Sequence, residues 1–206
     1  MPFLKSIPVD PQTTVYVWKI DASLDDFTSI SLSNNSKERL KAMRSEAHQM
    51  GFLSVRKLLE IAGYSDGDVY YNSNGKPFLE DGNHLSISHS YEYAALIVSD
   101  KPVGIDIEKN REKIVKIASK FVGAEQVFID TNNPLPQLSV IWGAKEALYK
   151  IAETPGIPFK EGLHIAPFTL KNQKTEAYTL IENQKSEYSI HFETIENFTL
   201  VYALPL

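Results

Sequence analysis

The segment Gly104-Ile-Asp-Ile-Glu108 carries two acidic residues, Asp106 and Glu108, that are two positions apart. On a β-strand alternate side chains lie on one face, so both carboxylates point the same way while Ile105 and Ile107 face the opposite side. Neighbouring carboxylates repel each other unless a cation or protons intervene. A hard dication such as Mg²⁺ takes oxygen ligands and accepts phosphate as a partner, so this pair is a candidate metal site. The alternative is an acidic pair that faces solvent and binds no metal.

A third acidic residue, Glu146, lies in Trp142-Gly-Ala-Lys-Glu-Ala-Leu-Tyr-Lys150. If residues 137–152 form a helix, Trp142, Glu146 and Lys150 share one face at spacings of i, i+4 and i+8. Glu146 is then a candidate third oxygen ligand, and Lys150 a candidate neighbour of a phosphate. The alternative is a surface ion pair between Glu146 and Lys150, which would contribute about 0.3–0.5 kcal/mol.

Three further segments carry polar groups that suit phosphate chemistry. Phe121-Val-Gly-Ala-Glu125 places Glu125 near an expected helix start, where it complements the helix dipole or accepts a proton from an attacking hydroxyl. Gly75-Lys-Pro-Phe78 and Leu85-Ser-Ile-Ser-His-Ser90 supply an ammonium, hydroxyls and an imidazole, which are all good phosphate donors. The Ser-His pair is no nucleophile signature, because the sequence has no G-x-S-x-G elbow.

The chain has a net charge of −5, which argues against nucleic acid as a partner, since nucleic-acid-binding proteins usually carry a basic footprint. Residues 37–57 depart from this balance. They contain two acidic side chains and the basic residues Lys37, Arg39, Lys41, Arg44, Arg56 and Lys57. A basic helix on an acidic protein indicates that an anion binds there. A solvated helix face is the alternative.

The elements that would position these residues alternate between helix and strand. We expect a strand over 15–20, followed by a long helix that is capped by Ser36 and ends at Gly63. Further extended segments are expected over 68–79, 84–99, 103–108, 176–182, 187–193 and 197–203, and helical segments over 111–129 and 137–152.

The order of elements roughly recurs after Asp100-Lys-Pro102. We therefore expect an α+β, pseudo-duplicated fold with two subdomains, 1–102 and 103–206, each a small sheet packed with helices, and with the active site between them. A single domain with one mixed sheet is the alternative.

The composition of the chain indicates in which cellular compartment the protein works. The chain has no cysteine, which excludes disulfides and thiolate zinc sites. No apolar run approaches the roughly 20 residues of a membrane span. The N-terminal segment lacks the pattern of a signal peptide. We expect a cytoplasmic protein without a membrane partner.

Taken in order, the motifs G-K-P, I-S-H-S, V-G-I-D-I-E, F-x-x-x-E and W-x-x-K-E-x-x-x-K resemble those of the 4′-phosphopantetheinyl transferase superfamily. The chain is similar in length to the longer, monomeric type, which acts on carrier proteins of peptide synthetases and of fatty-acid or polyketide synthesis. The motifs run from Gly75 to Lys150, and the resemblance covers residues 37–150 when the basic segment is included.

The resemblance implies a role for each matching residue. The metal ligands for Mg²⁺, or for Mn²⁺ in its place, would be Asp106, Glu108 and Glu146. The catalytic residues would be Glu125, Glu146 and Lys150, with either Glu125 or a metal-bound water as the base. The contacts to coenzyme A would come from Arg44, Arg56, Lys76, Pro77, Ser88, His89, Asp106 and Lys150, with Arg39 or Lys41 as alternatives in the basic segment.

The implied reaction moves the 4′-phosphopantetheine arm of coenzyme A to a serine of an apo acyl or peptidyl carrier protein and releases adenosine 3′,5′-bisphosphate. Positioning and charge neutralisation would supply most of the catalysis. One alternative is a protein that binds coenzyme A or a carrier without transfer, which the intact acids and Lys150 oppose. The other is a Mg²⁺-dependent phosphoesterase, which the lack of a recognisable histidine or aspartate nucleophile motif opposes.

Overall fold

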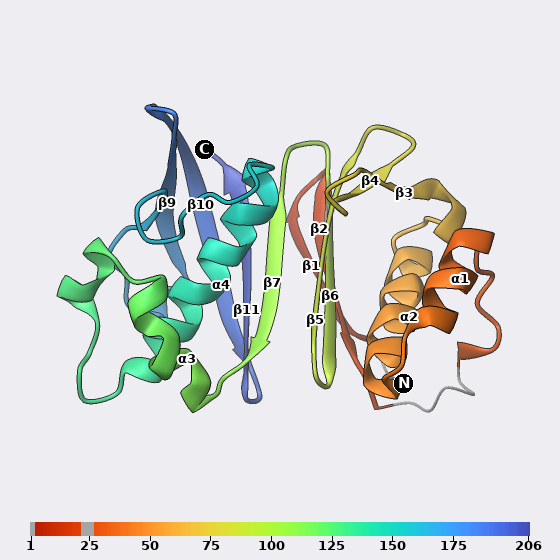
Figure 1. Cartoon of the computed structure of the whole chain (residues 1–206), viewed down its shortest axis with the longest axis horizontal. Coiled ribbons are helices and arrows are strands. Elements are labelled where there is room, and N and C mark those ends of the chain that lie inside the picture. Colours follow the sequence, from red (N-terminus) through yellow and green to blue (C-terminus); the bar gives the residue numbers. More distant parts are fainter. Residues whose placement is uncertain (1–2, 22–26) are drawn as a thin grey trace. The chain divides into compact units, whose positions relative to one another are not determined.

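The computed structural model describes residues 3–21 and 27–206, and the chain divides into two compact units, Met1–Asp100 and Lys101–Leu206 (Figure 1). They are called the N-terminal unit and the C-terminal unit below. Each unit holds an antiparallel sheet with helices packed on it. The chain is therefore of the mixed α+β class, which confirms that part of the prediction, while the pseudo-duplication stays a prediction.

The sheet of the N-terminal unit has the strand order β1-β2-β6-β5, and all neighbours are antiparallel. Its strands are β1 (Phe3–Asp10), β2 (Thr13–Lys19), β5 (His84–Ser90) and β6 (Tyr93–Ser99). The apolar β6 is buried along almost its whole length, and β2 alternates between buried and partly exposed residues. The sequence prediction missed β1, an edge strand that contains Pro8, a residue tolerated only where its missing N–H is not needed.

Two helices, α1 (Asn34–Ala42) and α2 (Glu46–Ile61), replace the single long helix predicted for this region, so that prediction was wrong. The break begins at Met43, whose backbone is extended with φ −75° and ψ 120°. The N-cap is Ser33, whose hydroxyl accepts a hydrogen bond from the N–H of Ser36. Gly63 follows the last turn of α2 with φ +89°, the left-handed conformation that glycine adopts at low cost. Helix α2 packs on β2, β5 and β6.

A short hairpin completes the N-terminal unit. It follows the 3₁₀ turn η2 (Asp66–Asp68) and pairs β3 (Val69–Tyr71) with β4 (Pro77–Leu79). Its turn is closed by a hydrogen bond from the Asn72 N–H to the Lys76 carbonyl, and Gly75 has φ +80°. The G-K-P motif therefore forms the end of this turn and the start of β4.

The sheet of the C-terminal unit has the order β7-β11-β10-β9-β8. Its strands are β7 (Gly104–Lys109), β8 (Leu163–Ile165), β9 (Lys174–Ile181), β10 (Gln184–Ile195) and β11 (Phe198–Pro205). Helix α4 (Pro134–Ala152) packs on β7, β8 and β11 (Figure 1). The strands predicted at 103–108, 176–182, 187–193 and 197–203 and the helix predicted at 137–152 are confirmed, with shifted ends.

The helical segment predicted over 111–129 is broken into α3 (Glu112–Ile117), η3 (Ala118–Lys120) and η4 (Ala124–Phe128). Gly123 lies between η3 and η4 with φ −115° and ψ −110°. A Cβ at Gly123 would lie 2.7 Å from the carbonyl oxygen of Lys160. The segment around Lys160 therefore passes too close to Gly123 for a side chain at that position.

Each unit has its own core. In the N-terminal unit, leucines of α2 pack with residues of β5 and β6, among them Leu58, Leu59, Leu85, Ala94 and Leu96. In the C-terminal unit, the buried side of α4 packs with β10 and β11 through residues that include Ile141, Ala144, Leu148, Ile190 and Val201. Burial of one such large aliphatic side chain contributes about 1.5–3 kcal/mol. No helix in the described part of the chain has the length and apolar character needed to cross a membrane.

Candidate functional site

Two glycines allow α4 to lie directly on the sheet of the C-terminal unit. A Cβ at Gly104, the first residue of β7, would lie 2.0 Å from the carbonyl oxygen of Ala147. A Cβ at Gly143 would lie 2.7 Å from Cγ2 of Val201 on β11. Both glycines belong to the motifs of the sequence, and neither position has room for a side chain. The close approach places the polar side of α4 beside the acidic residues of β7.

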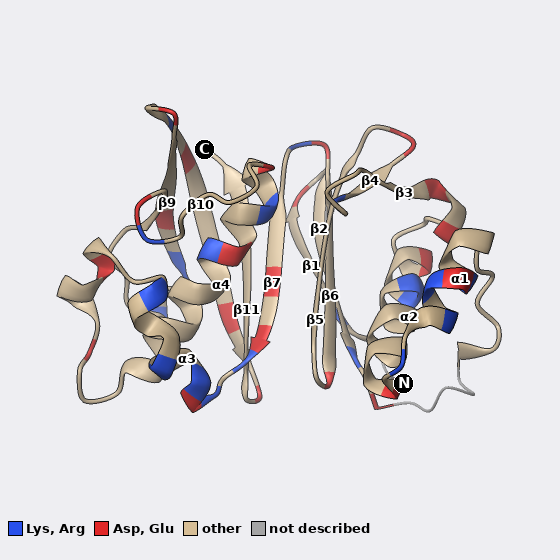
Figure 2. Cartoon of the chain, in the orientation of Figure 1, with Lys and Arg blue, Asp and Glu red and all other residues tan. Residues whose placement is uncertain are grey.

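The strand register explains which face of β7 meets the helix. Asp106 pairs across the ladder with Val201, and Val201 belongs to the core that α4 covers. Because alternate residues share a face, Asp106 and Glu108 lie on the side of α4, as predicted for one shared face. Ile105 and Ile107 lie on the other side and are buried. Figure 2 shows the resulting acidic segments on β7 and α4, with basic residues on α4.

Lys150 joins α4 to β7. Its ammonium donates to the carbonyl oxygen of Ile105 at 2.6 Å and to Oδ1 of Asp106 at 3.1 Å. The Lys150 side chain is 27% exposed, whereas Asp106 is buried. The ion pair of Lys150 is thus made with Asp106, and a hydrogen bond to a charged group of this kind is stronger than a neutral one.

Glu146 lies on α4 one turn before Lys150 and is partly buried. Burial raises the pKa of Glu146 to about 7, assisted by repulsion from Asp106 and Glu108 and opposed by the positive charge of Lys150. The shift places Glu146 in the same electrostatic cluster as both acids of β7. The carboxylates repel one another, as expected for groups that share a site.

Glu108 has a partner that the motifs did not indicate. Its Oε1 accepts a hydrogen bond from Nη2 of Arg111 at 3.0 Å, and both side chains are partly exposed. The sequence signal for this pair was their i, i+3 spacing at the end of β7, but spacing at a strand end does not fix a contact.

The ligands of the cluster suit a hard dication, because all three candidates are carboxylates, and burial together with repulsion from Asp106 and Glu108 raises the pKa of Glu146. The side chains are nevertheless not arranged as a metal centre. Within residues 3–21 and 27–206, no group of three or more histidine, aspartate or glutamate side chains is placed to hold a metal ion. Asp106 and Glu108 contact Lys150 and Arg111 instead. Magnesium binding by Asp106, Glu108 and Glu146 therefore stays a prediction.

Glu125 is not in this cluster but in a buried ion pair with Lys145, a motif residue to which the sequence assigned no role. Oε1 of Glu125 lies 2.9 Å from Nζ of Lys145, and the two side chains are 1% and 0% exposed. Oε2 accepts from the N–H of Gly123 at 2.8 Å, and Oε1 also accepts from the N–H of Ile165 at 3.1 Å. Burial alone would raise the pKa of Glu125, but the bonds from Lys145 and Gly123 outweigh it and lower the pKa.

A pocket of about 320 Å³ in the N-terminal unit brings four predicted coenzyme contacts together: Arg56, Pro77, Ser88 and His89. Arg39, an alternative within the basic segment, also lines it. The His89 ring lies against α2, since a Cβ at Gly51 would lie 2.9 Å from its Nδ1.

Two other predicted contacts are not brought to this pocket. Arg44 is exposed in the link between α1 and α2, and the ammonium of Lys76 lies 5.7 Å from the centre of the Phe78 ring. Neither is among the described residues that line the pocket.

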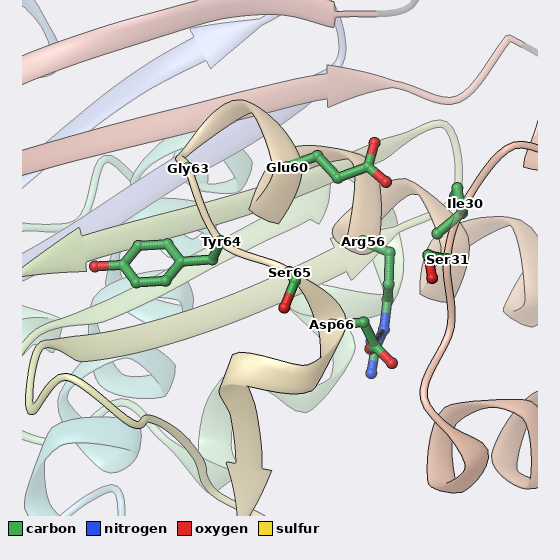
Figure 3. Close-up of a pocket in the computed structure, with 8 residues that line it drawn as sticks. All are labelled: Ile30, Ser31, Arg56, Glu60, Gly63, Tyr64, Ser65 and Asp66. Carbon is green, nitrogen blue, oxygen red and sulfur yellow. Dashed lines mark hydrogen bonds and ion pairs between the residues drawn. The ribbon is translucent and has the colours of Figure 1, made fainter.

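The guanidinium of Arg56 is held in a buried network. It is 3% exposed, and its Nε donates to Oδ1 of Asp66 at 2.8 Å. Its Nη2 donates to the hydroxyls of Ser36 and Tyr71. The central carbon of the guanidinium, Cζ, lies 3.5 Å from the centre of the Phe52 ring. Figure 3 shows Arg56 and Asp66 pointing toward one another at a second pocket, of about 290 Å³. Because Asp66 neutralises Arg56, the cation that the larger pocket offers to a ligand is Arg39, stacked 4.3 Å from the centre of the Tyr71 ring.

Comparison with known proteins agrees with these observations. Residues 102–203, nearly the whole C-terminal unit, match the family model described as the 4′-phosphopantetheinyl transferase superfamily. The 4′-phosphopantetheinyl transferase gsp of Aneurinibacillus migulanus is 29% identical over 188 residues, which cover 84% of this chain and 76% of that protein. A 4′-phosphopantetheinyl transferase of Bacillus subtilis is 29% identical over 147 residues, 65% of each chain. The 4′-phosphopantetheinyl transferase Sfp of Bacillus subtilis (strain 168) is 26% identical over 132 residues, 59% of each chain.

These matches show that the chain is an enzyme of the transferase class. The chain belongs to the 4′-phosphopantetheinyl transferase superfamily.

Proposed function

We propose that this enzyme transfers the 4′-phosphopantetheine arm of coenzyme A to a serine hydroxyl of an apo acyl or peptidyl carrier protein. The observation that carries the proposal is the contact of Lys150 with Asp106 beside Glu146, inside the span that matches the family. The serine oxygen forms a bond to the β-phosphorus of coenzyme A. The pyrophosphate P–O bond breaks, adenosine 3′,5′-bisphosphate leaves with the electron pair, and the serine proton is released.

Lys150 would stabilise the negative charge that develops on the pyrophosphate. An ammonium has three N–H donors, and the contacts to Ile105 and Asp106 hold it in a fixed place on β7. A donor fixed in advance stabilises developing charge without further rearrangement, which is a large contribution to catalysis in many enzymes.

Asp106, Glu108 and Glu146 would hold Mg²⁺, or Mn²⁺, once Glu108 turns from Arg111, while Asp106 keeps its contact with Lys150. The ion would act as a Lewis acid on the pyrophosphate oxygens. In its presence the carboxylate of Glu146 would be held in its charged form, because a nearby cation favours ionisation. Asp106, Glu108 and Glu146 would thus act as metal ligands, and the bound ion would orient the pyrophosphate of coenzyme A.

The pocket of the N-terminal unit would bind the nucleotide part of coenzyme A. Arg39, Ser88 and His89 supply cationic and hydroxyl donors for phosphate, and Pro77 borders an aromatic wall that includes Phe52 and Tyr71. Figure 2 shows the basic residues of α1 and α2 near which this pocket is built. Arg56 shapes the pocket, while Arg44 and Lys76 stay predicted contacts.

Other parts of the prediction remain proposals of the same kind. The proposal that the two units are a pseudo-duplication of one fold is supported by their common plan, since each holds an antiparallel sheet covered by helices. A monomer in the cytoplasm, acting on carriers of fatty-acid, polyketide or peptide synthesis, is what the resemblance implies.

The test is to incubate the protein with coenzyme A, Mg²⁺ and an apo carrier protein and to measure the carrier by mass spectrometry. We expect a mass gain of one phosphopantetheine arm, which is lost with EDTA and with a carrier whose acceptor serine is replaced by alanine. Coenzyme A that is bound but not consumed would contradict transfer and indicate a binding protein.

A further inference from the structure

The ion pair between Lys145 and Glu125 is one of the most deeply buried polar contacts in the C-terminal unit. Lys145 lies on α4 immediately before Glu146, and Glu125 lies on η4. The side chains are 0% and 1% exposed, so neither reaches solvent. Burying two charges is costly and is sustained only when hydrogen bonds satisfy both groups.

Those hydrogen bonds join α4 to three other segments. The ammonium of Lys145 donates to the carbonyl oxygens of Phe121 and Phe159, at 2.7 and 2.9 Å. Glu125 accepts from the N–H groups of Gly123 and Ile165, as described above. The pair therefore fixes the turn before η4, the loop at Phe159 and the end of β8 to the helix that carries Glu146 and Lys150.

An aromatic cluster surrounds the same junction. The ring of Trp142, one turn before Glu146, lies 5.1 Å from that of Phe121 and 5.7 Å from that of Phe159, centre to centre. The two carbonyl groups that Lys145 binds thus belong to the residues that pack on Trp142. A change at Lys145 must alter the surroundings of this indole.

We propose that Glu125 and Lys145 form a positioning pair that sets the place of Glu146 and Lys150 on α4, and that Glu125 is not the proton acceptor of the transfer. The statement about the proton acceptor rests on the proposed transfer reaction.

The geometry opposes a role for Glu125 as a base. Both of its oxygens accept hydrogen bonds from groups in fixed positions, and a base must come within hydrogen-bond reach of the proton that it removes. A carboxylate that is 1% exposed offers no surface to a serine on another protein. The lowered pKa of Glu125 is consistent with this, because it reflects a carboxylate held in its charged form.

A positioning role and a role as base for Glu125 predict opposite changes in transfer rate when Glu125→Gln is added to Lys145→Met. Lys145→Met leaves the charge of Glu125 buried without its ion-pair partner, so we expect a lower unfolding midpoint and a lower transfer rate. Adding Glu125→Gln removes that charge and keeps an oxygen acceptor for one of the two N–H groups, of Gly123 or of Ile165. We expect the Lys145→Met/Glu125→Gln double variant to recover part of both losses. A rate in the double variant below that of Lys145→Met would overturn the proposal.

Rates are compared at a temperature at which every variant is fully folded, and the exposed residue Lys185 supplies the matched control Lys185→Met. Near-ultraviolet circular dichroism reports on the packing of the aromatic side chains, with Trp142 as one of two tryptophans, independently of activity. We expect its signal to change in Lys145→Met, to return toward wild type in the double variant and to stay unchanged in Lys185→Met. An unchanged signal in Lys145→Met would contradict the positioning role even if the enzyme transferred nothing.

If Lys145→Met does not fold, Glu125→Gln alone decides between the roles. Removal of a general base lowers the rate roughly 10²- to 10⁴-fold. We expect a smaller decrease in kcat, with no loss of coenzyme A binding, because the amide that replaces the carboxylate keeps a hydrogen-bond acceptor at the same place. A decrease within the range of a lost base, in a variant with the wild-type near-ultraviolet circular dichroism, would assign Glu125 as the base.

Discussion

Gly104 lies against the backbone of Ala147 so closely that a Cβ at Gly104 would be 2.0 Å from the Ala147 carbonyl oxygen. This contact between the first residue of β7 and the C-terminal half of α4 is what permits Lys150 to reach Asp106. The two motifs that contain these glycine and alanine residues therefore depend on one another sterically. Replacing the glycine would separate the strand from the helix.

Gly104→Ala should destabilise the protein by about 1–3 kcal/mol or more, because overpacking against backbone cannot be relieved by a rotamer change. Urea unfolding followed by circular dichroism measures this loss. Gly67→Ala is the control, because its Cβ would meet only Ser65 Oγ, at an ordinary distance of 3.5 Å. Equal stability of Gly104→Ala and wild type would show that α4 and β7 are less close than described.

Lys150→Met should lower the transfer rate about 10²- to 10³-fold, the loss observed when one donor that stabilises developing negative charge is removed. Initial rates with saturating coenzyme A and carrier measure the effect. Lys150→Arg keeps the charge but not the compact ammonium, so only part of the rate should return. Activity of Lys150→Met close to that of the Lys185→Met control would remove Lys150 from the mechanism.

Arg39→Ala should weaken coenzyme A binding about 10- to 100-fold, since a hydrogen bond to a charged group contributes roughly 1.5–3 kcal/mol. Isothermal titration calorimetry measures the dissociation constant. Lys57→Ala is a suitable control within the same basic segment, because Lys57 already pairs with Glu60 at 2.8 Å. If Lys57→Ala weakens binding more than Arg39→Ala, the nucleotide binds elsewhere on the basic segment.

Because of the buried pair of Arg56 and Asp66, the free energy of unfolding should decrease at acidic pH. Burial would raise the pKa of Asp66, but hydrogen bonds from Ser33 and Ser36 and the charge of Arg56 outweigh it and lower the pKa. Because the pKa of Asp66 is lower in the folded than in the unfolded protein, its stabilisation is present above the unfolded pKa. That stabilisation is lost as pH falls through the folded value.

Asp66→Asn should cost about 3–5 kcal/mol at neutral pH, since it leaves the buried charge of Arg56 unpaired. It should also lose less stability than wild type between about pH 7 and about pH 3. Unfolding free energies at several pH values measure both effects, with the exposed carboxylate variant Glu187→Gln as control. Parallel pH curves for Asp66→Asn and wild type would contradict the assigned pair.

Local patterns predicted the parts of the site that depend on local geometry. The alternation in β7 placed Asp106 and Glu108 on one face, and the spacing in α4 placed Glu146 one turn from Lys150. Contacts between distant residues could not be predicted in this way. Lys145 and Glu125 are 20 positions apart, and nothing in the motif F-x-x-x-E distinguishes a base from a buried partner. Burial decides that, and it is set by the packing of the whole unit.

In the fold, too, local sequence patterns did not predict the features that depend on tertiary contacts. The segment around Met43 contains neither glycine nor proline, so no ordinary breaker signals the end of α1. Asp66 is given no role by the sequence motifs. The structure shows instead that its carboxylate binds Arg56 and Ser36, 10 and 30 positions away along the chain. This contact gives Arg56 a structural partner and leaves Arg39 as the pocket cation.

The most direct test of the central claim is the mass of an apo carrier protein after incubation with coenzyme A, Mg²⁺ and either wild-type enzyme or Glu146→Ala. We predict one added phosphopantetheine arm with wild type and none with Glu146→Ala, because the acidic cluster loses the carboxylate of α4 that is one of its three proposed metal ligands. Modification at the wild-type rate by Glu146→Ala, or none by the wild-type enzyme, would contradict this prediction.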